Sequence, residues 1–168
     1  MPSSLLRVFY VGLVMLSSNL SFAQAMPRTT GETLSGKPIV LADAVPGRVT
    51  LLVAGFSREG GAKAGDWVKA VHSDPALSHL SVFQIAMIAG APAFIRGMIK
   101  NSMKKGVPLA DQDRFVVLTT DEQPWKSYFG VTVNGDPYVE LLDAKGKILW
   151  QGHGSAALLE SKLRAALP

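Results

Sequence analysis

Apolar runs alternate with amphipathic segments along most of this 168-residue chain. Three short apolar runs, rich in β-branched and aromatic residues, predict buried strands at 49–56, 82–88 and 115–119. The spacing of apolar residues between these runs predicts helices at 62–72 and 92–105. We therefore expect an α/β fold in which a central mixed β-sheet is flanked by helices.

The remaining predicted elements lie on either side of this middle section. They are a short strand at 37–41, a short helix at 122–128, two strands at 138–142 and 148–151, and a final helix at 155–167. The turn Asp143-Ala144-Lys145-Gly146 between the last two strands is typical of an antiparallel hairpin. Ser155 is expected to cap the final helix.

The first residues have the layout of a secretory signal peptide. Arg7 precedes a short apolar core, and the segment ends in Ala23-Gln24-Ala25. We expect residues 1–25 to be a signal peptide, residues 26–35 to be a flexible segment, and 36–168 to be one domain. Such a signal directs the protein to the periplasm or the extracellular space, and an uncleaved membrane anchor is the alternative.

Composition excludes several kinds of chemistry. The chain has no cysteine, which rules out disulfides, thiol catalysis and iron–sulfur clusters. Its three histidines are not clustered with other ligands, and no nucleotide-binding glycine motif is present, so we expect no metal and no cofactor. The formal net charge of +4 is small, and the aromatic residues are not interleaved with basic ones. Both observations argue against nucleic-acid binding.

Two segments resemble a known arrangement. GETLSGKPIVLADAVPGRVTLLVAGF (31–56) and FGVTVNGDPYVELLDAKGKILWQGHG (129–154) are similar to the opening and closing sections of thioredoxin-like and peroxiredoxin-like domains. The resemblance implies a thioredoxin-like three-layer fold with a C-terminal β-hairpin and helix. It also implies that Pro137, preceded by Asp136, is a cis proline facing the turn after the central strand. That turn has no thiol here, so oxidoreductase and peroxidase activities do not transfer.

A narrower resemblance concerns three phrases of the sequence. GFSREGGAKAGDW, APAFIRGMIKNSMKKGVP and QDRFVVLTTDEQPWKSYFGV are similar to the mitochondrial ATP synthase assembly-factor family. The resemblance implies a thioredoxin-like protein without a redox site, which helps a membrane subunit of the ATP synthase into the complex.

The turn Ser57-Arg58-Glu59 is the first candidate site. It begins a predicted helix, where free backbone N–H groups and the helix dipole favour an anion, and Arg58 adds donors for a carboxylate or phosphate. Asp136 and Pro137 would lie across from it. Alternatively, Ser57 is only a helix cap and Arg58 pairs with Glu59 or water, and base rates favour this simpler interpretation.

The helix predicted at 92–105 is the second candidate. Its apolar residues spread over one half, and beside them lies a basic ridge made of Arg96, Lys100, Lys104 and Lys105. This surface suits anionic lipid headgroups or an acidic, apolar partner segment. The simpler alternative, again favoured by base rates, is an ordinary surface helix with solvated lysines.

These observations favour a protein that acts by binding and is not an enzyme. We expect an exported, redox-inactive assembly factor or chaperone for a membrane protein complex. The alternative is a small-anion binder or a cysteine-free enzyme that uses the Ser57-Arg58-Glu59 turn. A structural envelope protein without a discrete site is the third interpretation.

Overall fold

The computed structural model describes residues 25–168, and strands alternate with helices through its middle section as expected. The strands are β1 (Thr30–Thr33), β2 (Pro38–Val40), β3 (Thr50–Gly55), β4 (Ser81–Met87), β5 (Phe115–Leu118), β6 (Pro137–Leu142) and β7 (Ile148–His153). The helices are α1 (Leu41–Ala44), α2 (Arg58–Ser73), α3 (Ala93–Gly106), α4 (Glu122–Phe129), α5 (Ala156–Ala165) and the 3₁₀ helix η1 (Leu109–Arg114).

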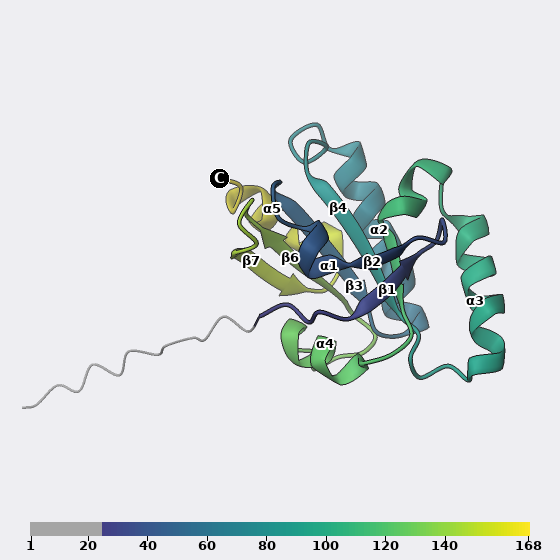
Figure 1. Cartoon of the computed structure of the whole chain (residues 1–168). Helices are drawn as coiled ribbons and strands as arrows, with labels where there is room; N and C mark the ends of the chain where they lie inside the picture. Colours follow the sequence, from purple (N-terminus) through teal and green to yellow (C-terminus); the bar gives the residue numbers. More distant parts are fainter. Residues whose placement is uncertain (1–24) are drawn as a thin grey trace, which may run out of the picture.

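The strands of the described chain form one mixed sheet in the order β2-β1-β5-β4-β3-β6-β7 (Figure 1). β3 pairs in parallel with β4, β4 pairs in parallel with β5, and the remaining neighbours are antiparallel. All six residues of β3 are buried, because helices cover both faces of the sheet at this strand. The predicted central strand, the mixed sheet and the C-terminal hairpin are confirmed.

Helices on both faces give the molecule three layers. Leu51 and Val53 of β3 point to the face covered by α2 and α5. Leu52 and Ala54 point to the opposite face, which α1 and α4 cover. α3 lies over the first face as well, but at the β5 and β1 side, away from α5 (Figure 1). No helix within residues 25–168 combines the length and the apolar character that crossing a bilayer requires.

The N-terminal part of the domain differs from the expectation. The segment 26–35 was expected to be flexible, which is wrong for residues 30–34: β1 lies between β2 and β5 in the sheet, and Leu34 is buried. The buried positions of β1 itself are Gly31 and Thr33, so the strand shows no apolar alternation in the sequence. The signal-peptide prediction falls almost wholly on residues 1–24, outside the described part of the chain.

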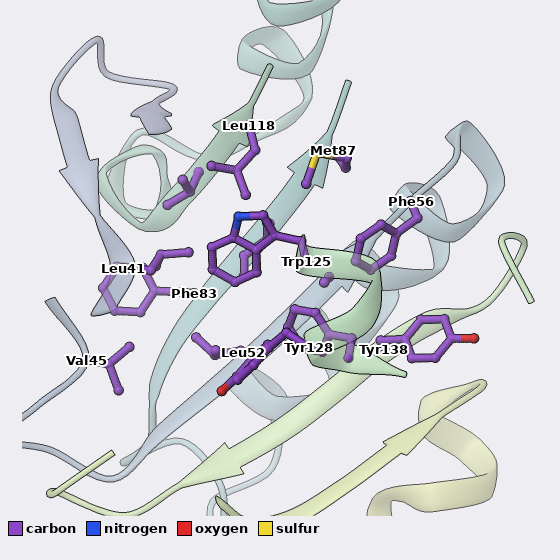
Figure 2. Close-up of a cluster of buried hydrophobic side chains, with 14 of the residues drawn as sticks. Leu41, Val45, Leu52, Phe56, Phe83, Met87, Leu118, Trp125, Tyr128 and Tyr138 are labelled. Carbon is purple, nitrogen blue, oxygen red and sulfur yellow. The ribbon is translucent and has the colours of Figure 1, made fainter. Parts of the chain in front are cut away.

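The largest core cluster combines aliphatic and aromatic side chains and lies under α4 (Figure 2). Trp125 is fully buried, and its ring stacks on Phe129 at a centroid distance of 6.1 Å. Phe56, at the end of the β3 run, packs edge-on against Phe129 and Tyr138 at 5.9 Å each. This cluster fixes the position of the chain just before α2, which is where the first candidate site lies.

A buried carboxyl group lies on the same face of the sheet. Glu140 of β6 is fully buried and is paired in register with Leu52 of β3. Neither of its carboxyl oxygens has a hydrogen-bond partner in the described chain. Burial raises the pKa of Glu140 to about 7, although the Tyr128 side chain acts in the opposite direction. Near neutral pH the group is therefore distributed between its neutral and charged forms.

The free energy of unfolding should consequently fall as the pH rises. The pKa of Glu140 is about 7 in the folded state against an ordinary value of 4.5, so the folded state holds the proton more tightly. The stabilisation that the protonated Glu140 gives to the folded state is complete below pH 4.5 and is lost as the pH rises through about 7. A shift of this size corresponds to roughly 3 kcal/mol. Urea denaturation between pH 5 and pH 8 measures it.

Glu140→Gln removes the titration and retains the shape of the side chain. Its unfolding free energy should vary less with pH than that of the wild type. Parallel profiles for the wild type and Glu140→Gln would contradict the assignment.

Candidate functional site

The turn after β3 is already the beginning of α2. The helix starts at Arg58, four residues before the predicted start at Ala62. Ser57 has extended backbone angles, and its hydroxyl oxygen accepts a hydrogen bond from the N–H of Gly60 at 3.0 Å. The cap compensates for the glycines of the first turn, which propagate a helix poorly. Glu59 lies in the first turn, where the helix dipole favours a negative charge.

A short segment before β6, residues 134–136, closes over this helix start; we call it the closing loop. The hydroxyl of Ser57 donates to the carbonyl oxygen of Asn134 at 2.7 Å. Gly60 faces the same loop: a Cβ atom at Gly60 would lie 2.9 Å from the carbonyl oxygen of Asp136 and 3.0 Å from that of Asn134. The loop can approach this closely only because residue 60 has no side chain.

Ionic contacts hold the closing loop from two sides. The ammonium group of Lys63 lies 2.8 Å from the Glu59 carboxylate, donates to the carbonyl of Gly135 at 2.9 Å, and lies 3.8 Å from Asp136. The hydrogen bond with Glu59 raises the pKa of Lys63 above its ordinary value. On the other side, Nδ1 of His153 lies 2.9 Å from the Asp136 carboxylate. The loop is thereby joined to both α2 and β7.

The expected cis peptide bond before Pro137 is wrong, because the described residues contain no cis peptide. Trans is the lower-energy isomer of an X-Pro bond unless tertiary contacts oppose it. Here the contacts agree with trans: Pro137 pairs with Gly55 in the antiparallel register, and the Asp136 carbonyl lies against Gly60. The loop does face the turn after the central strand, as the resemblance implied.

The structure thus brings Ser57, Glu59 and Asp136 together. Ser57 and Glu59 make contacts within the chain, whereas Arg58 is exposed and pairs with no carboxylate in residues 25–168. Arg58 does not pair with Glu59, because Glu59 pairs with Lys63 one helical turn further on. These contacts favour the simpler interpretation, in which Ser57 is a helix cap and Arg58 is exposed to solvent.

Sequence reasoning missed three residues of this cluster: Lys63, Asn134 and His153. The four-residue spacing of Glu59 and Lys63 was a usable signal, since such pairs meet on a helix surface. The predicted hairpin was a second usable signal. In it Tyr138 pairs with His153, and Asp136, only two residues before Tyr138, is therefore close enough for His153 to reach it. Across the described residues, no three acidic or histidine side chains are grouped so that they could hold a metal ion.

The basic ridge of α3 divides into two halves. The Arg96 guanidinium donates to the carbonyls of Ala91 and Ala89 at 2.8 Å each, and Lys100 forms an ion pair with Glu32 at 2.6 Å. Lys104 and Lys105 are exposed, and neither has a carboxylate partner in the described chain. Only this second half of the ridge is available for another molecule.

Gly60→Ala should destabilise the protein, since the added methyl group would collide with the two carbonyls of the closing loop. We expect a loss of about 1–3 kcal/mol in the free energy of unfolding, the range for overpacked sites. Gly61→Ala is the matched control. No atom lies within 4 Å of a Cβ at that position, and alanine propagates a helix better by about 1 kcal/mol. Urea denaturation measures the stability of both variants. Equal stabilities of Gly60→Ala and Gly61→Ala would contradict the close contact between Gly60 and the closing loop.

Comparison with known proteins places the chain in a family. The family model described as ATP10 protein matches residues 19–165. No curated protein matches the sequence at a significant level. Solved structures provide a second comparison, which concerns the fold.

Three similar structures illustrate that fold. Etrx1, an exposed lipoprotein thioredoxin of Streptococcus pneumoniae, has 18% identity and a TM-score of 0.53, covering 83% of this chain and 98% of that one. A thiol:disulfide interchange protein DsbE from Chlorobium tepidum has 21% identity and a TM-score of 0.55, covering 86% and 96%. BsSco, of the Sco family of cytochrome c oxidase assembly proteins, has 16% identity and a TM-score of 0.55, covering 85% and 92%.

The structures at these identities show the fold alone, and that fold is thioredoxin-like as the sequence indicated. The family match spans most of the chain and agrees with the narrower resemblance. The protein is therefore a member of the ATP10 protein family with a thioredoxin-like fold that carries no cysteine.

Proposed function

We propose that this chain is an exported, redox-inactive assembly factor that binds a membrane subunit of the ATP synthase while the complex forms. The observation that carries the proposal is the family match over residues 19–165. The fold is compatible with such a role, since BsSco belongs to a family of assembly proteins for another membrane complex. The protein would act by binding and not by catalysis.

The residues after β3 support a role without thiol chemistry. Thiol–disulfide exchange begins with attack by a thiolate, and this chain has no cysteine to provide one. The place expected for a reactive pair holds Ser57, whose hydroxyl contacts Gly60 and Asn134. The closing loop packs against this helix start at Gly60.

Loss of the protein should reduce the amount of assembled ATP synthase. Membranes from a deletion strain, separated by native gel electrophoresis, should contain less intact complex, and partly assembled forms should accumulate. A plasmid copy of the wild-type gene should restore the complex. Normal levels of intact ATP synthase in the deletion strain would contradict the proposal.

The purified protein should also fail to accelerate the reduction of insulin by dithiothreitol, the usual assay for thioredoxin activity. A rate above that of the uncatalysed reaction would contradict redox inactivity, although the assembly role could still hold.

Export can be tested separately. The apolar core after Arg7 and the Ala23-Gln24-Ala25 end of the leader support cleavage before Met26. Mass spectrometry of the protein isolated from its source should therefore find a chain that begins at Met26. An intact N-terminus in a cytoplasmic fraction would contradict export, and an intact N-terminus in a membrane fraction would favour the uncleaved anchor.

A further inference from the structure

The outer side of α3 carries large apolar side chains that the rest of the described chain does not cover. None of its residues is fully buried, and it contacts the sheet only through partly buried side chains such as Ile99 and Met103. The helix stands at the side of the molecule opposite α5 (Figure 1). Phe94 and Met98, one turn apart on its outer side, are 88% and 71% exposed. Because they are neighbours on the helix surface, these two side chains form one exposed apolar patch, a feature of protein interaction sites.

Four exposed residues of α3 have the spacing of a socket for a partner side chain. Phe94, Gly97, Met98 and Asn101 occupy positions i, i+3, i+4 and i+7, the set that forms a hole in knobs-into-holes packing. Gly97 is one of these four residues and has no side chain, and a Cβ there would meet no atom within 4 Å. A side chain from a second helix can therefore enter between Phe94 and Met98 and approach the α3 backbone.

Charge indicates what kind of helix would fit. α3 contains no acidic residue. Its first two basic side chains, Arg96 and Lys100, are used within the chain, and this leaves Lys104 and Lys105 at the C-terminal end without a partner in the described residues. A complementary surface would be apolar opposite Phe94 and Met98 and acidic opposite the two lysines.

We propose that this face of α3 docks an amphipathic helix of a partner protein, one apolar side chain of which enters the hole above Gly97 while acidic residues meet Lys104 and Lys105. The inference rests on the proposed function, because the partner helix would belong to the ATP synthase subunit under assembly. It assigns the binding to α3 and not to the turn after β3, where Ser57 already bonds to the closing loop and Glu59 pairs with Lys63.

A lipid surface fits the same face less well. Basic side chains near an anionic membrane contribute about 1 kcal/mol each, and only Lys104 and Lys105 of this helix are available. The hole above Gly97 is also a feature that a fluid bilayer does not need, whereas helix–helix packing uses it directly.

Binding measurements on α3 variants test the proposal. The full-length mature protein is immobilised, and the separate membrane subunits of the organism's ATP synthase are applied in detergent. Gly97→Trp fills the hole, and Met98→Glu places a negative charge within the apolar stripe. Each should weaken binding by about tenfold or more, as for residues at the centre of an interface. Leu158→Glu on α5, at a residue 73% exposed, is the matched control and should bind like the wild type.

Circular dichroism and thermal melting establish that each variant is folded, which the open surroundings of Gly97 and the exposure of Met98 allow. If a subunit binds the wild type and both α3 variants equally, the proposal for α3 is overturned and the proposed function stands. If no subunit binds the wild type, the proposed function itself fails. Flotation with vesicles of phosphatidylcholine and phosphatidylglycerol completes the test: lipid binding that Met98→Glu abolishes, without subunit binding, would overturn the helix partner in favour of a membrane surface.

Discussion

The contact between the start of α2 and the closing loop is the constraint on which the centre of this protein depends. β3 leads directly into α2, and β6, which pairs with β3 along its whole length, begins directly after the loop. One hydroxyl group, that of Ser57, satisfies a helix N–H and a loop carbonyl at the same time. The absence of a side chain at Gly60 lets the two segments meet. In a thioredoxin-like fold this junction is expected to expose a reactive pair of thiols. In this chain it has no thiol, and its Ser57 and Gly60 contact the closing loop.

The surface that we propose for partner binding lies on α3 and not at the start of α2. α2 is tightly held, since Trp67 is fully buried and its ring N–H donates to the carbonyl of Gly154 at 2.8 Å. α3, on the same face of the sheet, buries no residue completely and turns Phe94 and Met98 outward. The proposed binding role needs an apolar surface that is not buried in the core, and Phe94 and Met98 of α3 form such a surface.

The sequence was sufficient for the fold because its strongest signals are the buried ones. The continuous apolar runs of β3, β4 and β5 and the hairpin turn at Asp143 to Gly146 are local patterns with few alternative interpretations. The hydrophobic pattern missed β1 because its two buried positions are Gly31 and Thr33, although the resemblance of residues 31–56 to thioredoxin-like domains implied a short strand pair there. The start of α2 was misplaced because glycine-rich sequence argues against a helix, whereas the Ser57 cap and the Glu59–Lys63 pair stabilise its first turn.

The candidate sites were less predictable for the same reason. Which lysines of the basic ridge are available depends on Glu32 and on backbone carbonyls, and helical spacing alone does not show these partners. The isomer of Pro137 depends on how the closing loop meets Gly60. Long-range contacts decide each of these details, and a single sequence contains no direct record of them.

The most direct test of the proposed mode of action, binding through α3 and not through the turn after β3, is cross-linking mass spectrometry on intact membranes. A lysine-reactive reagent should join Lys104 or Lys105 to a membrane subunit of the ATP synthase. Lys63, beside the turn after β3, serves as the internal reference because it lies within the same ionic cluster as the closing loop. Cross-links to that complex from Lys63 alone, or to no ATP synthase subunit at all, would contradict the account.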